Sequence, residues 1–211
     1  MLPLLLDTNC REWLIENFDM GRPREFDIDR AVDTAMGLFW RQGYEKTSLT
    51  DLTHALNITP PSFYFAFGSK EKLFKTVLDR YMETQFAYFD RALCQPTSRG
   101  VATLLLKSFA EAYTDPAHPG CLCVNSSSPC STSDDPIRKE IGKWRSSVHG
   151  KLSKRFKLAK AQKDLPADAN PDDLTDYLLI VATGMALAAQ SGASRKDLLR
   201  TVTTALNAWP N

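Results

Sequence analysis

The chain has 211 residues, 43% of them hydrophobic and 24% charged, with a formal net charge of +1 at pH 7. This length and composition support one substantial core or two smaller ones and exclude a compositionally disordered protein. The near-zero charge gives no field that would attract nucleic acid, so evidence for such a partner must come from local residues.

The N-terminal extension, residues 1–20, holds the longest uncharged apolar run, Met1 to Leu6. That run is far shorter than the roughly 20 residues of a membrane span, and it lacks the basic start and cleavage site of a signal peptide. We therefore expect a cytoplasmic protein with no membrane partner, whose five cysteines are reduced thiols. The extension is either a genuine extra helix or the product of a start codon assigned too early.

Helical periodicity begins after this extension. The apolar residues between Asp27 and Gly43 recur at three- and four-residue spacing, which predicts one helix that Gly43 ends. A second, short helix is predicted over residues 49–56, with Ser48 as its N-cap. Asn57, a residue type that tolerates positive φ, then turns the chain.

The stretch ITPPSFYFAFGSK, residues 58–70, predicts a third helix. Thr59 can cap it, and its first turn holds Pro60 and Pro61, where a missing backbone N–H costs nothing. The helix must stop near Gly68. Two short helices joined by a tight turn, with a preceding helix to support them, are the arrangement of a helix-turn-helix DNA reader.

Placed in a major groove, such a helix brings its first residues to the base edges, and the prolines offer them flat apolar surface, for instance to a thymine methyl. Tyr64, one turn along, can reach a phosphate. Lys70, with the free N–H groups behind Ser69, forms an anion site at the start of the next helix. Phe63 and Phe67 are expected to face inward.

The run from Gly21 to Phe74 resembles the N-terminal domain of the TetR family of transcriptional regulators, through GYEKTSL, DLTHALNI and PSFYFAFGSKEKLF at the family's spacing. The resemblance implies an all-α homodimer with an N-terminal three-helix helix-turn-helix DNA-binding domain and a C-terminal helical effector-binding and dimerisation domain. Its partner would be a pseudo-palindromic double-stranded DNA operator. Carried over by position, the DNA-contacting residues are Thr47, Thr50, Thr59, Pro60, Pro61, Ser62, Tyr64 and Lys70.

Some features around this motif remain open. Ala66 stands where many family members carry a histidine, so a phosphate contact is absent there. Each of three residues has a structural alternative to DNA contact: Thr47 as a helix cap, Tyr64 as a packing aromatic, and Lys70 as an ordinary solvated lysine. Arg22 and Arg24 form either a basic arm that reaches a minor groove or a solvated tail.

The pattern predicts the domain organisation. We expect residues 21–68 to form the DNA-binding domain and residues 69–94 a connecting helix. The segment CQPTSRG then breaks the pattern. Residues 95–211 would form the effector-binding and dimerisation domain.

The middle of this C-terminal region alternates between ordered and irregular sequence. The segment DPAHPGCLCVNSSSPCSTSDDP crowds prolines, serines and cysteines into a span that can hold at most a short helix. A long helix is predicted from Pro136, and its outer face between Arg138 and Lys163 is strongly basic. We interpret this as a solvated helix face rather than a membrane or nucleic-acid surface.

The last two predicted helices, residues 171–190 and 194–209, carry few charges and several small residues. Such apolar surface favours burial against a second copy of the chain. The predicted dimer interface comprises Leu174, Leu178, Val181, Met185, Leu198, Val202, Ala205, Leu206 and Trp209.

An unknown small-molecule effector would bind among inward-facing residues of the C-terminal helices, each of which can equally be plain core. The candidates are Phe86, Phe89, Phe109, Tyr113, Cys121, Trp144, Val148, Tyr177 and Met185.

The cysteines suggest alternatives. Cys121, Cys123 and Cys130 could sense an oxidant or electrophile, Cys121 first, or bind a soft metal with His118, although their spacing is not the paired C-x-x-C of a zinc fold. A rival class is a small cysteine-dependent enzyme that uses Cys121 with His118 or His149, but no nucleophile elbow, phosphate loop or metalloprotease motif supports it.

A third interpretation is a helical adaptor that binds acidic partners through the basic helix. We expect a DNA-binding transcriptional regulator, a ligand-responsive repressor, with no catalytic residue, metal or cofactor.

Overall fold

A computed structural model describes residues 26–85, 87–127 and 136–210. The described residues form α-helices and no strand, as the predicted all-α class requires. The helices are α2 (Ile28–Gln42), α3 (Leu49–Leu56), α4 (Pro60–Phe67), α5 (Lys70–Gln85), α6 (Ala87–Leu93), α7 (Ser98–Tyr113), α8 (Leu122–Asn125), α9 (Pro136–Ala161), α10 (Pro171–Gln190) and α11 (Arg195–Asn207).

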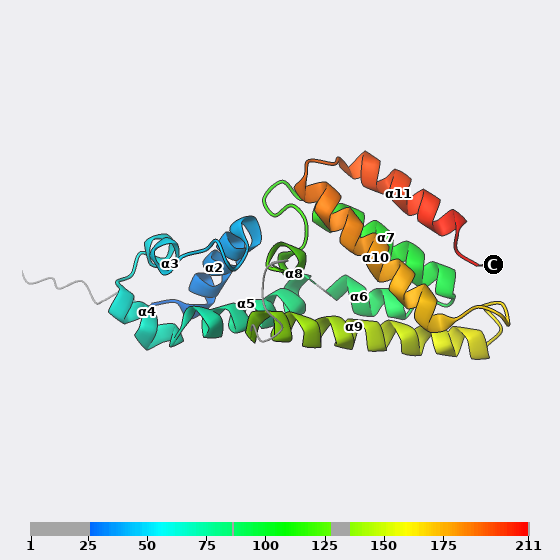
Figure 1. The fold of residues 1–211 in the computed structure, drawn as a ribbon, viewed down its shortest axis with the longest axis horizontal. Coiled ribbons are helices and arrows are strands. Elements are labelled where there is room, and N and C mark those ends of the chain that lie inside the picture. Colours follow the sequence, from blue (N-terminus) through cyan, green and yellow to red (C-terminus); the bar gives the residue numbers. More distant parts are fainter. Residues whose placement is uncertain (1–25, 86, 128–135, 211) are drawn as a thin grey trace, which may run out of the picture.

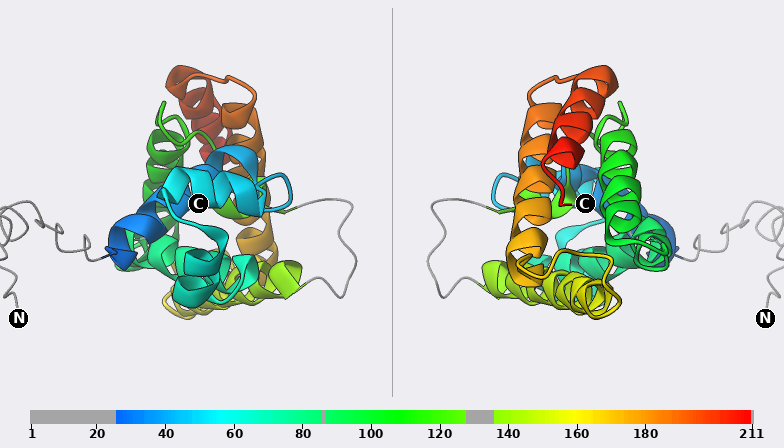
Figure 2. Two further views of the ribbon diagram at one scale, coloured as in Figure 1. Left: turned by 90° about the vertical axis from the view of Figure 1, so that its left-hand side faces the viewer. Right: turned by 90° about the vertical axis from the view of Figure 1, so that its right-hand side faces the viewer.

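The helices fall into two groups along the long axis of the molecule. Helices α2, α3 and α4 gather at one end, and α5 extends from them towards the other group (Figure 1). In the second group α10 packs against both α9 and α7, and α11 packs against α7 and α10. The end views show α7 and α10 on opposite sides, with α9 along the bottom and α11 at the top (Figure 2).

Local capping interactions fix the bounds of the short helices. Ser48 and Asp51 form a reciprocal capping box at the start of α3, and Asn57 ends that helix in the left-handed region with φ 53°. Thr59 accepts a hydrogen bond from a backbone N–H at the start of α4, and Gly68 ends α4 at φ 73°. These turns follow the sequence prediction because each depends on residues within one helical turn.

The first helices share one aromatic core. Phe39, Leu52, Phe63 and Phe74 are fully buried, and the rings of Phe39 and Phe74 meet edge to face with centroids 5.1 Å apart. Phe63 therefore faces inward as predicted, and Phe67 packs partly buried against the same core. This core holds α3 and α4 against α2 and α5.

The connecting segment predicted over residues 69–94 contains α5 and α6, and Phe86 between them lies outside the described residues. Helix α5 packs against α2 of the first group, whereas α6 packs against α7 of the second. The two parts of the segment therefore belong to different groups of helices.

Much of the basic face of α9 is engaged within the chain. Lys143 pairs with Glu140 at 2.8 Å, and Lys157 pairs with Asp172 at 3.1 Å. Arg155 donates to backbone carbonyls in the segment that joins α6 to α7. These contacts within the chain argue against a docking surface for a partner on the basic face. Across the part of the chain that the structure describes, no helix combines the length and apolar character needed to cross a membrane.

Candidate nucleic-acid interface and effector cavity

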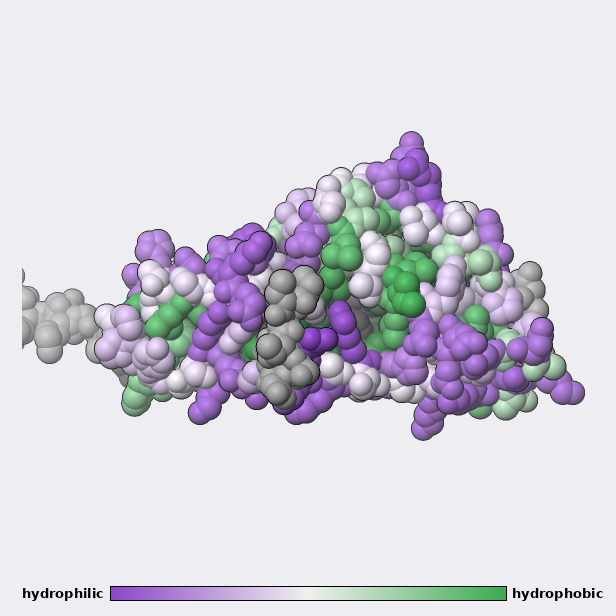
Figure 3. All heavy atoms as spheres, in the orientation of Figure 1, coloured by the Kyte–Doolittle hydropathy of each residue, from purple (hydrophilic) through white to green (hydrophobic). Residues whose placement is uncertain are grey.

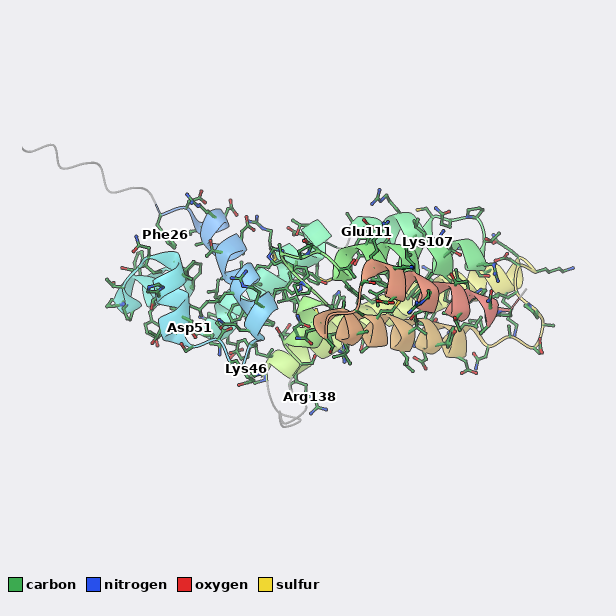
Figure 4. The ribbon with its side chains drawn as sticks, turned by 90° about the horizontal axis from the view of Figure 1, so that it is seen from above. Phe26, Lys46, Asp51, Lys107, Glu111 and Arg138 are labelled. Carbon is green, nitrogen blue, oxygen red and sulfur yellow. The ribbon has the colours of Figure 1, made fainter. Side chains whose placement is uncertain are left out.

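The outer face of α4 carries most of the predicted DNA-contacting residues. Thr59, Pro60, Pro61 and Ser62 are exposed at the start of the helix, and Tyr64 is 53% exposed one turn later. The structure therefore brings these residues together on one accessible surface. Thr50, also exposed, lies in the first turn of the neighbouring helix α3. Figure 4 shows Asp51 of α3 at this end of the molecule, far from Lys107 and Glu111 on α7.

Thr47 does not belong to this surface. Its side chain is fully buried, and its hydroxyl donates a 2.7 Å hydrogen bond to the carbonyl of Gly43. The prediction that its side chain contacts DNA is corrected accordingly. The hydroxyl instead closes the turn between α2 and α3, which leaves it no free reach towards a phosphate or a base.

Lys70 is the first residue of α5 and follows the end of α4 by three residues. Its ammonium lies 4.1 Å from the centre of the Tyr44 ring, a cation–π contact. Partial burial lowers the pKa of Lys70 from its ordinary value, while the carboxylates of Glu45 and Asp51 act in the opposite direction. The side chain is thus held in place at the N-terminus of a helix, where backbone N–H groups also favour an anion.

One exposed residue of α4 escaped the sequence analysis. The side chain of Phe65 is 95% exposed, more than any other large hydrophobic side chain that the structure describes. It lies four residues after Pro61, a spacing that places two residues on one side of a helix. The spacing from Pro61 was the signal in the sequence that could have identified Phe65 as outward-facing. The sequence alone did not show which aromatic of α4 faced outward.

Several predicted residues lie outside the described residues. These are Arg22 and Arg24 of the basic arm, Phe86 of the effector set, Cys130 of the cysteine set, and the whole extension 1–20.

A cavity of about 460 Å³ lies among α7, α8, α9 and α10. Most of its wall is apolar or aromatic, with Arg145 and Asp176 as its charged residues. Hydrophobic side chains also gather on the molecular surface over α10, above α9 (Figure 3). The predicted residues that line the cavity are Phe109, Tyr113, Cys121, Trp144 and Val148. The lining residues that sequence reasoning missed are Val124, Arg145, Asp176, Leu179, Ile180, Ala182, Thr183 and Gly184.

Three predicted effector residues do not line this cavity. Phe89 lines a neighbouring hollow that shares Trp144 and Val148. The hydroxyl of Tyr177 donates to the carbonyl of Ala205 at 3.1 Å, which ties α10 to α11. Met185 is 2% exposed and lies in the protomer core. Their apolar character identified all three as inward-facing, but the sequence could not show whether an inward-facing residue lines this cavity, lines another hollow or packs against a neighbouring helix.

The thiol of Cys121 forms the most chemically distinctive part of the cavity wall. Cys121 is the N-cap of α8, and its sulfur lies 3.4 Å from the hydroxyl of Tyr81. Hydrogen bonds from Cys123, Tyr81 and backbone N–H groups lower the pKa of Cys121 to about 6 against the opposing effect of burial. Burial raises the pKa of Cys123. Of the two thiols, that of Cys121 is therefore the more acidic.

The soft-metal alternative gains no support from the described residues. Within residues 26–85, 87–127 and 136–210, no three His, Cys, Asp or Glu side chains come close enough to hold a metal ion. His118 lies against the Trp40 ring, with ring centres 5.0 Å apart. His149 faces Asp176, with Nε2 3.1 Å from the carboxylate.

Helix α8 connects this cavity to the first group of helices. The side-chain amide of Asn125 donates to the carbonyl of Trp40 at 2.9 Å and to that of Pro119 at 3.2 Å. A Cβ added to Gly43 would lie 2.5 Å from the backbone oxygen of Asn125, so only glycine allows this close approach. Figure 1 shows α8 between α2 and α10. Residues that line the cavity are therefore a few residues from a direct contact with α2.

The outward surface of α10 corrects the predicted dimer interface. Leu178, Met185, Leu198, Val202, Ala205 and Trp209 are at most 5% exposed and form part of the core of a single protomer. Leu174, Val181 and Leu206 are partly exposed and remain candidates. The exposed large apolar residues on this helix are Ile180, 70% exposed, and Leu187, 50% exposed.

The chain is similar to known families over most of its length. Residues 31–77 match the family described as "Bacterial regulatory proteins, tetR family". Residues 103–205 match the family described as "Tetracyclin repressor-like, C-terminal domain". The two matches correspond to the two groups of helices.

Individual proteins are similar over nearly their full length. The HTH-type transcriptional repressor ComR of Escherichia coli (strain K12) is 34% identical, with 90% of this chain and 92% of that protein covered. The HTH-type transcriptional repressor BdcR of the same strain is 28% identical, with 88% and 90% covered. A solved structure of the regulator CifR, a cysteine mutant complexed with 26bp double-strand operator DNA, superposes with a TM-score of 0.83. It is 34% identical, with 90% of this chain and 100% of that chain covered.

Proposed function

This chain belongs to the TetR family of DNA-binding transcriptional regulators, and we propose that it is a homodimeric repressor whose hold on DNA is weakened by a small molecule. Its partner is a pseudo-palindromic double-stranded operator. The observation that carries the proposal is the α3–α4 pair, whose second helix presents an exposed face that no other part of the described chain covers.

The polar contacts of this reader divide into two kinds. Tyr64 and Lys70 are suited to phosphates, which fix the position of the protein without reading sequence. The start of α4 and Thr50 are suited to base edges or to the sugar–phosphate backbone beside them. We therefore retain Thr50, Thr59, Pro60, Pro61, Ser62, Tyr64 and Lys70 as the proposed DNA-contacting residues.

Two copies would associate through the exposed face of α10. Ile180 and Leu187 lie seven residues apart, which is two helical turns, and so face the same side. Exposed apolar side chains in such a row are typical of an interface between protein subunits. In a two-fold dimer the two DNA-binding domains are related by symmetry. Each would bind one half-site, and so the operator should be a pseudo-palindrome.

The proposal is tested by selecting operators from random-sequence duplex DNA with the purified protein, whose mass in solution is measured in parallel. We expect a dimer, and an enriched pseudo-palindrome with half-sites about one helical turn, or a small multiple, apart. A monomer at micromolar concentration, or no enrichment of any sequence, would contradict the proposal.

The effector site is the cavity among α7, α8, α9 and α10. Its volume of about 460 Å³ suits a drug-sized molecule, and its mainly apolar wall with a few polar groups is typical of small-molecule sites. Phe109 and Tyr113 stack with ring centres 5.2 Å apart and form one aromatic side of it. We expect a largely apolar effector.

A second candidate function is a thiol response at Cys121. The lowered pKa supports it, because a thiolate is the reactive form of cysteine. Brief treatment with iodoacetamide should modify Cys121 before Cys94, which is exposed but lies outside the cavity, and should weaken operator binding. The variant Cys121→Ser should bind the operator as tightly as the wild type and should not respond. An unlabelled Cys121, or labelling without loss of affinity, would exclude the thiol response and leave the apolar effector.

We further propose that the chain acts by binding and not as a thiol enzyme, and that it works in the cytoplasm, where its DNA target lies. The contacts of the cavity thiol support the first point. Cys121 is hydrogen-bonded with Tyr81 and Cys123, whereas His149 pairs with Asp176 and His118 stacks on Trp40. A histidine base next to the thiol is the feature that a cysteine enzyme needs.

A further inference from the structure

We propose that Phe65, together with Pro61, forms an apolar reading face that recognises thymine methyl groups and supplies much of the sequence preference of α4. This inference rests on the proposed function, because it assumes that α4 enters the major groove. It concerns which chemical group on the DNA is read, and by which residue.

Geometry places Phe65 at the centre of the outward face of α4. Phe63 is fully buried, and Phe67 packs partly buried against the same core. These two residues define the inward side of the helix. Phe65 lies about 160–200° from them at 100° per residue and is 95% exposed. Pro61, four residues earlier, lies on the same side and is also exposed.

The composition of α4 excludes the usual polar readout by this helix. Its sequence, PPSFYFAF, contains no Arg, Lys, Asn or Gln. Those are the residue types that make bidentate contacts to guanine or adenine in the major groove. A helix without them must obtain its preference from hydroxyl groups, from apolar contacts, or from the shape of the DNA.

The hydroxyl groups at the start of α4 already have partners within the chain. The side-chain oxygens of Thr59 and Ser62 lie 3.0 Å apart and share a hydrogen bond, and Thr59 also accepts from the Ser62 N–H at 3.4 Å. The shared hydrogen bond occupies one of the two hydroxyl hydrogens, so this cap reduces the capacity of Thr59 and Ser62 to read a base. Tyr64 lies about 100° around the helix from Phe65 and is assigned to a phosphate. Much of the sequence preference is therefore assigned to the apolar groups of the outward face.

Thymine is the base that offers an apolar partner. Its C5 methyl projects into the major groove, and contact with a phenylalanine ring is an established way to recognise it. An almost fully exposed phenylalanine leaves its apolar surface in water in the free protein. Contact with a methyl group removes part of that surface from water only on a sequence with thymine in the right place, which produces a preference for that sequence.

The test removes the methyl group alone. In the selected operator, each thymine is replaced in turn by deoxyuridine at the same position of both half-sites, and Kd is measured at constant salt. We expect the wild type to lose about fourfold in affinity per methyl group, hence about 15-fold for the two half-sites, at the position that faces Phe65. Phe65→Ala should bind more weakly and should no longer distinguish thymine from uracil there.

Two variants make the result specific. Tyr64→Phe is the matched control on the adjacent residue: it should weaken binding to the thymine and uracil operators equally, because its hydroxyl is assigned to a phosphate. Phe65→Leu keeps an apolar side chain and should retain part of the preference for thymine. If Phe65→Ala binds too weakly for the ratio of its affinities for the thymine and uracil operators to be measured, Phe65→Leu supplies that ratio.

The outcomes separate this inference from the proposed function. An operator that is enriched but bound equally well after every thymine-to-uracil replacement would overturn the reading face and leave the DNA-binding proposal intact. The same holds if Phe65→Ala keeps the wild-type thymine preference. Failure to enrich any sequence would overturn both.

Discussion

Two threonines near the start of α3 occupy similar places in the sequence but different environments in the structure. Thr47 is buried and bonded to Gly43, while Thr50 is exposed. Thr47→Val should lower the free energy of unfolding by about 1–3 kcal/mol, because it leaves the carbonyl of Gly43 without its donor. Operator affinity per folded molecule should not change. Urea denaturation and fluorescence anisotropy measure the two quantities.

Thr50→Val is the matched control. It removes the same hydroxyl from an exposed position, so stability should stay within about 0.5 kcal/mol of the wild type, while operator affinity should fall. The reverse pattern, with stable but poorly binding Thr47→Val, would return Thr47 to the DNA surface.

The ammonium of Lys70 offers a prediction about salt. Lys70→Ala should weaken binding to operator and random DNA by the same factor, and should reduce the slope of log affinity against log salt by about one for each phosphate that the lysine neutralises. A series of anisotropy titrations at increasing salt measures this slope. Lys154→Ala removes the same charge from an exposed site on α9 and should leave the slope unchanged. An effect confined to one operator sequence would instead show that Lys70 reads a base.

The contrast between Thr47 and Phe65 shows where residue-level prediction from sequence stops. The caps Ser48, Thr59 and Asn57 were predicted correctly because a cap depends on a few neighbouring residues. Exposure depends on which helices pack over a residue, and that information lies far along the chain. A polar threonine was therefore assigned to the DNA surface, and an exposed aromatic was left without a role.

At the scale of the single element, α10 is apolar on more than one side. One side carries Leu178 and Met185 into the protomer core, and another exposes Ile180 and Leu187. Hydrophobic periodicity identified α10 as a helix with the bounds that the structure shows, but it could not tell the core of one protomer from a contact with a second. Six of the nine residues predicted for the interface therefore lie in the core of a single protomer.

The two sides of α10 should respond differently to mutation. Ile180→Glu should convert the dimer into a folded monomer, because it places a charge in the proposed interface without touching the protomer core. Size-exclusion chromatography with light scattering measures the mass, and circular dichroism confirms the helical content. Operator binding should weaken sharply, since both half-sites are read only by a dimer.

The buried side provides the control. Leu178→Ala should reduce the free energy of unfolding by about 2–5 kcal/mol, as is typical of a large-to-small change in a core. The molecules that remain folded should still be dimers. If Leu178→Ala yields a stable monomer while Ile180→Glu stays dimeric, the interface lies on the side that the sequence first suggested.

At the scale of the whole molecule, α8 is the point where the cavity and the reader meet. Asn125 bonds to the carbonyl of Trp40 in α2, and the Trp40 ring contacts Tyr81 of α5, which in turn contacts Cys121. Asn125→Ala removes the hydrogen bonds to Trp40 and Pro119. Hydrogen exchange should then become faster at the C-terminal end of α2 and remain unchanged in α10, which lies on the other side of the cavity. If the substitution changes the exchange rates at the end of α2 and in α10 by the same factor, α8 does not support the DNA-binding domain.

The two domains were recognisable from the sequence because each has its own motifs and periodicity. Their connection was not, because it depends on contacts such as the hydrogen bond from the Asn125 amide of α8 to the carbonyl of Trp40 in α2, two residues that lie 85 positions apart in the chain. Such long-range contacts leave no local pattern. The same limit explains why only five of the thirteen residues that line the cavity were predicted: Leu179, Thr183 and Gly184 lie on α10, and their place in the wall depends on how that helix packs against α7 and α9.

The contact of α8 with α2 bears on how this regulator acts in a cell, because it can couple the cavity to the DNA-binding domain. A coupling free energy of about 1–3 kcal/mol, the usual range between two sites, changes operator affinity by about 5- to 150-fold and no more. Saturating effector then weakens repression by a fixed factor instead of abolishing it. The number of repressor molecules per cell would decide whether that factor is enough to empty the operator. We expect maximal expression of the controlled gene to fall as repressor copy number rises, however much effector is present.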